Sequence, residues 1–590
     1  MSVGKYSLVA LDTDHIKQYV FGTDRLKEIR GASSILDRLN RQVMVELAEA
    51  NDIRAIPVYA NGGSGQFLVD TEKVGLFTQR VKGVYSADAF DGASISCAVQ
   101  PLPDLPLEQI WTEKIPGELE LLRWRLHDAK NNPPDVVSLP SHPFMRTCDA
   151  CGVEYAAQKD TKSRDDRDEE NQEKRYCLSC WAKRKEDGAV KRRITRMVRS
   201  LHKRKKVPEP ERQTLWGRLI SQLDEVHYKI PRGTERPHQF DDFSEGGAKD
   251  YLGLIYADAN NMGKRLERIE NLTDTRRLAR IVDNGVYRAL AVAIKEHTTI
   301  KEVANEAAVD DMDDADEDED TQEGKKTLFP FDILLIGGDD IIIVTRASVA
   351  LQIARTMAQE FYDWTSKQFQ QTFPAWSEEE KLGLTLSVGV VLAPIKYPFG
   401  LLFKLVEGTL KAAKKKGAEV SSSEIYGKSC INFVTVTGNT GPEYKSVYDQ
   451  LQREVKASNV MLYATLRPYT LSEMDGMLGL LEKGHERRLG RTKLHQLREA
   501  VLERNLTTSI IAGIAALRNW KGEQRDFIVR ELYAFRRPNV VPADAPQRLG
   551  LVTFPWYFGG EDQEMREVYR TPLLDFVELY DFVGKGETEQ

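Results

Sequence analysis

The feature that most constrains the fold of this chain is an order of segments that occurs twice. Each copy has an apolar run ending in acidic residues, a helical segment, two apolar runs around a Gly-rich tip, a helix and a last apolar run. The first copy begins at Tyr6 (YSLVALDTD) and has its tip at 61–65 (NGGSG); the second begins at Tyr251 (YLGLIYADA) and has its tip at 337–340 (GGDD). This order is typical of the ferredoxin-like βαββαβ arrangement. We therefore predict two domains of that fold.

The remaining sequence fills out an α+β multidomain chain. At 590 residues the chain is too long for a single core, since domains of about 150 residues are typical. After Gly427, apolar residues recur at helical spacing and predict a C-terminal helical domain. The predicted division is 1–140 for the first βαββαβ domain, 141–190 for a cysteine module, 191–248 for a helical linker, 249–428 for the second βαββαβ domain with an acidic insertion near 303–327, and 429–590 for the helical domain.

Charge is strongly segregated although the net charge is only −7. The run Asp310–Asp320 is nearly pure acid, cannot bury a core, and predicts a disordered surface insertion. The run Lys191–Lys206 is nearly pure base and either follows a nucleic-acid backbone or is a solvated helix; the sequence leaves both open. No apolar run is long enough for a membrane span, and no signal peptide opens the chain, so we expect a cytoplasmic protein without a membrane partner.

The second tip places two like charges side by side at the end of a buried hairpin, in FDILLIGGDDIIIV. A single Asp would serve an ordinary β-turn, whereas two adjacent carboxylates repel each other and call for a cation. In a βαββαβ sheet, Asp258 at the end of the neighbouring strand would join Asp339 and Asp340. Carboxylates of this kind hold Mg²⁺ (or Mn²⁺), and two such ions can clamp a phosphoryl transfer. Gly337 and Gly338 would let a nucleotide approach the backbone.

Four of the six cysteines form two CxxC pairs, which predicts a metal site. Two such pairs suit one tetrahedral Zn²⁺, and a site closed by four sulfurs is structural, not catalytic. The predicted ligands are Cys148, Cys151, Cys177 and Cys180. The other two, Cys97 and Cys430, are interpreted as ordinary small residues of the core.

Several motifs occur in a familiar order between Tyr256 and Gly417: YADANNMG, LLIGGDDIIIV, LSVGVVLAPIKYP and AAKKKG. With these motifs and the opening LVALDTDHIKQYVFGTDRLKEIRG, the chain resembles the large polymerase-like subunit of type III CRISPR effector complexes, particularly of the Cmr type. The resemblance implies two palm domains of the polymerase kind. It also implies ATP as substrate and cyclic oligoadenylates as products, made when target RNA binds. The implied partners are the other subunits of the complex, guide RNA and target RNA.

The resemblance also implies roles for individual residues of the second palm. Asp258, Asp339 and Asp340 would be catalytic metal ligands; Gly337, Gly338, Asn261 and Ser387 would line the nucleotide site; and Lys414 and Lys415 would reach the triphosphate. Cations that complement the C-terminus of a helix are the alternative for the two lysines.

The chain departs from many members of that family at its N-terminus. It opens on the first palm, and its one HD dipeptide, His127-Asp128, lies on a predicted helix without partner histidines, so we expect no HD nuclease activity. Two other functions remain open: a dinucleotide cyclase that uses GTP, as in the GGDEF group, and a catalytically silent CRISPR scaffold. The C-terminal domain would dock small subunits, and the aromatic cluster TFPWYFGG is either a docking surface or core.

Overall fold

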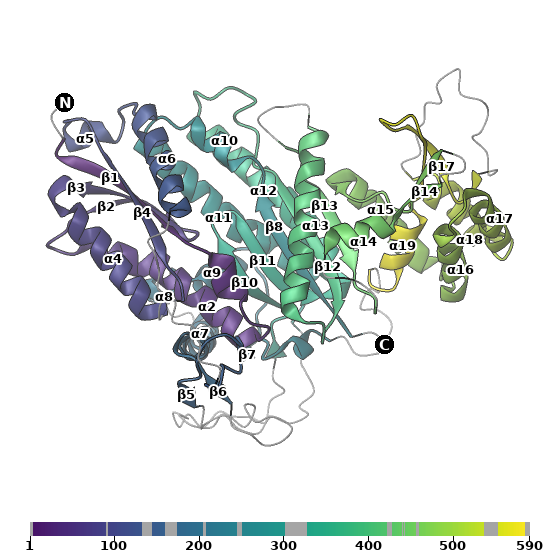
Figure 1. Cartoon of the computed structure of the whole chain (residues 1–590), viewed down its shortest axis with the longest axis horizontal. Helices are drawn as coiled ribbons and strands as arrows, with labels where there is room; N and C mark the ends of the chain where they lie inside the picture. Colours follow the sequence, from purple (N-terminus) through teal and green to yellow (C-terminus); the bar gives the residue numbers. More distant parts are fainter. Residues whose placement is uncertain are drawn as a thin grey trace.

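The computed structural model of the chain describes residues 4–89, 92–132, 144–159, 174–203, 208–244, 250–300, 327–421, 427–438, 441, 443–455, 459–535 and 553–583. The predicted acidic insertion near 303–327 lies outside the described residues except for Thr327. Figure 1 shows the first βαββαβ domain on the left, the second in the middle and the C-terminal region on the right.

The first domain is an antiparallel sheet covered on both faces. Its elements are β1 (Tyr6–Thr13), α1 (Ile16–Phe21), α2 (Leu26–Arg38), α3 (Met44–Glu49), β2 (Ile56–Asn61), β3 (Ser64–Asp70), α4 (Val74–Ala89), β4 (Ile95–Pro101), α5 (Leu107–Ile110) and α6 (Pro116–Asn131). The strands pair in the order β2-β3-β1-β4. Side chains alternate along β1: Val9 and Leu11 pack on the α2 and α4 side, whereas Leu8 and Ala10 pack on the α6 side. The predicted βαββαβ order is therefore confirmed here.

The second domain repeats this order around a larger sheet. Its elements are β8 (Tyr251–Ala259), α10 (Met262–Glu267), α11 (Leu272–His297), β9 (Thr327–Leu328), β10 (Phe331–Gly337), β11 (Asp340–Arg346), α12 (Ala350–Thr372), β12 (Leu386–Pro394), α13 (Phe399–Glu419) and β13 (Cys430–Thr435). In the described part of the chain these strands pair as β10-β11-β8-β12-β13-β16, with β16 at Tyr469–Thr470. β13, which follows the predicted domain boundary at 428, extends this sheet in parallel with β12.

The two domains share one hydrophobic core. Helices α11 and α12 cover one face of the second sheet, where Ile255 and Ile343 are buried. The other face, with Tyr256 and Ile342, packs against α13 and against α2 of the first domain. Because α2 lies between both sheets, the first domain fixes the position of the second.

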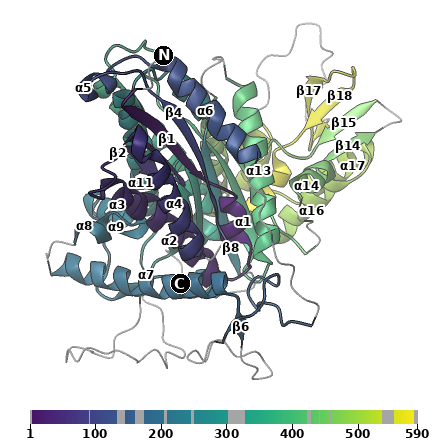
Figure 2. The ribbon, with the colours of Figure 1, turned by 60° about the vertical axis from the view of Figure 1, so that its left-hand side comes forward.

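A long helix, α7 (Leu178–His202), runs along the underside of both domains and packs on α2 (Figure 2). It follows the short hairpin β5 (Gln158–Lys159) and β6 (Arg175–Tyr176), and it continues past the predicted boundary at 190. It precedes α8 (Glu209–Arg212), α9 (Leu215–Glu225) and β7 (Thr234–Glu235), which pairs with β9.

The basic run forms the second half of α7 as far as the structure describes it. Ile194 and Met197 are buried, while Arg193 pairs with Glu186 at 3.3 Å and Arg196 pairs with Glu211 at 2.9 Å. The run is thus a packed amphipathic helix with paired charges, which favours the solvated-helix interpretation.

A buried ion-pair network ties α2, α7 and β10 together. Arg30 donates to Asp332 Oδ2 at 3.0 Å and to Asp187 Oδ2 at 2.8 Å, and Arg236 donates to Asp332 Oδ1 at 2.8 Å. Asp332 is fully buried. Removal of one member would leave an uncompensated buried charge, so the network specifies how the two domains meet.

The C-terminal region contains the predicted helices and also a sheet. Its elements are α14 (Tyr444–Gln450), β14 (Gln452–Val455), β15 (Val460–Tyr463), α15 (Leu471–Glu486), α16 (Arg491–Leu502), α17 (Leu506–Leu517), α18 (Gly522–Asp526), β17 (Tyr557–Glu561), β18 (Glu567–Arg570) and α19 (Leu573–Tyr580). The strands pair as β14-β15-β18-β17. Phe554 and Trp556 are buried, so the aromatic cluster belongs to the core. None of the described helices has the length and apolar character that a membrane span requires.

Candidate active site

The paired aspartates lie at the tip of the β10–β11 hairpin. Gly337 pairs with Asp340 at the end of the ladder, and Gly338 has a φ of 68°, in the left-handed region that a glycine adopts without strain. The strands behind the tip are apolar and buried, which holds both carboxylates at the rim of the sheet.

Asp258 ends the neighbouring strand at the same edge. β8 pairs with β11 up to Ile341 and Ala257, so the register carried on by one residue sets Asp340 opposite Asp258. On its other side Asp258 pairs with Ser387 of β12. The structure therefore brings the three predicted acids to one edge.

Burial and mutual repulsion raise the proton affinity of the tip. The pKa of Asp339 rises to about 7, first through burial and then through the charges of Asp258 and Asp340. Burial, followed by the charge of Asp258, raises the pKa of Asp340 to about 6. The Tyr256 hydroxyl donates to Asp340 Oδ1 at 2.9 Å and fixes that carboxylate. A bound cation would relieve the repulsion between these carboxylates.

Two cations face these acids from different domains. The Lys414 ammonium of α13 lies 2.5 Å from Asp258 Oδ2. Lys17 of α1, in the first domain, lies 5.0 Å above the Tyr256 ring and 3.8 Å from Glu407. Its charge opposes the rise in the Asp340 pKa.

The other residues predicted from the sequence lie at different distances from the acidic edge, some beside it and some in other parts of the structure. Ser387 is fully buried, and its hydroxyl donates to Asn260 Oδ1 at 2.8 Å. Asn261 is the N-cap of α10 with a φ of 56° and makes no side-chain cap bond. Lys415 is exposed and lines a separate cavity beside the C-terminal region. His127 and Asp128 lie on the surface of α6, where the His127 ring contacts Asn131.

The tip of the first domain touches the tip of the second. A Cβ atom built on Gly62 would lie 2.3 Å from the Gly338 nitrogen, so the two backbones are in direct contact. Both glycines adopt positive φ, 61° and 68°. The first hairpin thus closes one side of the acidic edge.

The carboxylates suit Mg²⁺ by the chemistry of their donors. Oxygen atoms from Asp258, Asp339 and Asp340 are the ligands that this ion prefers. Among the described residues, the His, Cys, Asp or Glu side chains that bring three or more ligand atoms within 4.8 Å of one another are the four cysteines. The three aspartates do not meet this distance in the structure. Asp258 is held by Lys414 here.

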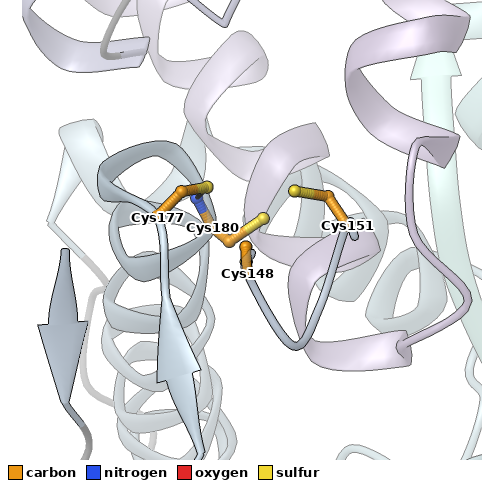
Figure 3. A group of neighbouring side chains, drawn as sticks. All are labelled: Cys148, Cys151, Cys177 and Cys180. Carbon is orange, nitrogen blue, oxygen red and sulfur yellow. Dashed lines mark hydrogen bonds between the residues drawn. The ribbon is translucent and has the colours of Figure 1, made fainter. Parts of the chain in front are cut away.

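The four predicted cysteines come together in a metal-type cluster (Figure 3). Their sulfur atoms all lie within 4.8 Å of one another, and in a zinc tetrahedron with Zn–S bonds of about 2.3 Å the sulfurs are roughly 3.8 Å apart. Backbone amides donate to two of them: Cys180 N to Cys177 Sγ at 3.3 Å, and Ala150 N to Cys148 Sγ at 3.4 Å. The residues fit a structural zinc ion that anchors the start of α7.

Sequence reasoning missed three residues of the acidic edge. Tyr256 lies two positions before Asp258 on the same strand, so strand alternation could have placed it on the same face. Asn260 follows the same strand end. Lys17 carries no such signal, because only the packing of the first domain against the second brings it to Asp340.

A comparison with protein families finds one match on this region. Residues 251–420 match the family model described as Cas10/Cmr2, second palm domain. This part of the chain is therefore similar to the second palm domain of Cas10/Cmr2 proteins. The expected resemblance is confirmed for this domain, which contains the acidic edge, and from here we call the two βαββαβ domains the first and second palm.

Solved structures similar to the chain include those titled "Csm1-Csm4 cassette in complex with cA4" and "Csm1 in T.onnurineus". The first has a TM-score of 0.47 and 12% identity, and the match covers 86% of this chain and 64% of that chain. The second has a TM-score of 0.43 and 14% identity, with 87% and 64% covered. This chain therefore spans less than two thirds of their length. A search of curated proteins finds no match.

Proposed function

We propose that the chain is the large subunit of a type III CRISPR effector complex and that its second palm converts ATP into cyclic oligoadenylates after target RNA binds. The observation that carries this proposal is the gathering of Asp258, Asp339 and Asp340 at one sheet edge of a Cas10/Cmr2-type palm. Companion subunits, guide RNA and target RNA are the proposed partners.

The reaction is the attack of a ribose hydroxyl on an α-phosphate, with pyrophosphate as the leaving group. Catalysis of this kind rests on positioning and charge stabilisation. When bound by the three aspartates, Mg²⁺ or Mn²⁺ supplies positive charge to the phosphoryl oxygens. Tyr256 orients Asp340 for this purpose through its 2.9 Å hydrogen bond.

Other residues of the edge serve the nucleotide. Gly337 and Gly338 present no side chain, so a triphosphate can approach the hairpin backbone. Lys414 neutralises Asp258 in this structure and provides positive charge for the triphosphate. The Ser387–Asn260 hydrogen bond holds the adjoining strand end in place.

The remaining parts of the chain support assembly. The cysteine cluster would hold Zn²⁺ and fix α7 beneath both palms. Ile511 and Ile514 of α17 are 64% and 42% exposed, an apolar surface on the region that we expect to dock companion subunits.

The test is product formation by the assembled complex. Labelled ATP and labelled GTP are incubated separately with Mg²⁺, with matched or mismatched RNA, and the products are resolved by chromatography. We expect cyclic oligoadenylates from ATP with matched RNA alone, and a loss of at least about 10³-fold in the Asp339→Asn, Asp340→Asn double variant. The exposed Asp52→Asn serves as the matched control.

The other outcomes identify the alternatives. Products from GTP only would establish a dinucleotide cyclase. No product from the wild-type complex with any activator would establish a scaffold. Unchanged product formation in the double variant would contradict the assignment of the acidic edge as the active site.

A further inference from the structure

A cavity lies between α13 of the second palm and the C-terminal region. Its volume is about 540 Å³. Ligand sites of roughly 300–1,000 Å³ are typical. The lining brings Lys415 and Lys416 together with Tyr444, Tyr448 and Arg570.

The cavity beside α13 is rich in positive charge that the described residues leave unpaired. Lys415 and Lys416 have no ion-pair partner in the described part of the chain, and Arg570 stacks 4.5 Å above the Tyr463 ring without one. Glu419 is the acid in the lining. Arg467 also lines the cavity, but Asp575 and Glu578 neutralise it at 2.9 and 3.0 Å. The cavity therefore attracts an anion.

Aromatic rings form another part of the wall. Tyr444 and Tyr448 of α14 are half-buried and stacked, with ring centroids 5.6 Å apart and planes at 20°. Buried Tyr557 joins them from β17. Cations beside aromatic rings are the combination that binds nucleotides, because the rings stack on bases while the cations meet phosphates.

We propose that this cavity binds a nucleotide unit, a base with its phosphate, at a site separate from the acidic edge. The unit comes either from an RNA strand or from a free nucleotide, since both present the same chemistry. Lys415 and Lys416 directly follow Lys414, which holds Asp258, so one helix carries residues of both sites.

The experiment measures binding to the full chain with the acidic edge disabled by Asp339→Asn and Asp340→Asn, in EDTA. The probes are fluorescein-labelled hexa-adenylate RNA, followed by anisotropy, and ATP, followed by calorimetry. In this background, Lys416→Glu with Arg570→Glu is expected to weaken binding of at least one probe by tenfold or more. Tyr448→Leu is expected to weaken binding of the same probe by about fivefold.

Lys411→Glu is the matched control, because Lys411 is on the same helix, is 72% exposed and lies outside the cavity lining. It should change binding by less than twofold. Thermal unfolding confirms that each variant is folded, and the charge reversal carries the test if Tyr448→Leu is not.

Each outcome decides the proposal. A loss confined to RNA identifies a strand as the source, and a loss confined to ATP identifies a free nucleotide. Unchanged binding of both probes in the charge reversal would overturn the proposal. So would an equal loss in Lys411→Glu, or equal competition by hexaglutamate, since either shows unspecific attraction of anions.

Discussion

The two palms carry the same ion pair at the same place. In the first palm, Lys130 of α6 lies 2.6 Å from Asp12 at the end of β1; in the second, Lys414 of α13 lies 2.5 Å from Asp258 at the end of β8. Asp12 pairs with a serine of the adjoining strand, as Asp258 does. The pair thus belongs to the shared framework.

The palms differ at the hairpin tips. Where the second palm has Asp339 and Asp340, the first has Gly63 and Ser64 at the matching positions of its β2–β3 hairpin. The first hairpin forms without acids at its tip, so the fold itself does not require the aspartate pair at the second tip.

The largest expected effect is a difference in product formation between substitutions in the two ion pairs. Asp258→Asn should lower product formation by about 10²–10³-fold, because it removes charge beside the reacting phosphate. Asp12→Asn should change it by less than about threefold, because no acids face Asp12 from its hairpin. Initial rates with labelled ATP measure both. Equal losses would show that the palms are functionally alike.

Asp332→Ala should separate the palms by breaking the buried network that joins them. The loss leaves two buried arginines, Arg30 and Arg236, to share the carboxylate of Asp187 and costs about 3–5 kcal/mol. Urea unfolding followed by circular dichroism measures it. Asp52→Ala, which breaks an exposed pair with Arg80, should have little effect. Similar midpoints for both variants would contradict the role of the network.

The acidic tip should make the stability of the chain fall as pH rises. The first tip cannot cause such a fall, because it carries no acids. The pKa of Asp339 is raised from 3.8 to about 7, so between these values the native chain binds more protons than the unfolded chain. Stability therefore falls as pH rises through this window. Asp339→Asn should reduce the fall by on the order of 2 kcal/mol.

Thermal unfolding at pH 5 and pH 8 in EDTA measures this difference. Ser64→Ala in the first tip is the control and should leave the pH dependence unchanged. A wild-type chain that gains stability toward pH 8 relative to Asp339→Asn would refute the expected sign.

The smallest effect tests the contact between the tips. In Gly62→Ala the new Cβ would lie 2.3 Å from the Gly338 nitrogen at a positive φ, so the second tip must shift. We expect a loss of about 1–2 kcal/mol and lower product formation. Gly75→Ala has nothing within 4 Å of its Cβ and should cost little. Rates and unfolding midpoints that match in both variants would show that the contact is dispensable.

Much of this arrangement could be predicted from local patterns. Strand alternation and turn glycines predict both βαββαβ domains, and the CxxC spacing predicts the cysteine cluster that the structure brings together. The strand order of the βαββαβ fold alone predicts that Asp258, Asp339 and Asp340 meet at one edge of the sheet.

Contacts between distant segments could not be predicted. Lys17 reaches the acidic edge through domain packing, and Lys415 lies in the α13 cavity although it follows Lys414. Consecutive residues of a helix point in directions about 100° apart, so neighbours in sequence need not share a site. The C-terminal sheet pairs β15 (Val460–Tyr463) with β18 (Glu567–Arg570), and short-range periodicity gives no signal for a pairing between such distant segments.

The contact between Gly62 and Gly338 has a consequence for hydration. The first palm covers one side of the acidic hairpin, so two domains together supply the burial that raises the pKa of Asp339. Parting the palms would admit water, and Asp339 would bind its proton less tightly. Domain separation and proton release are thereby linked, and each must favour the other.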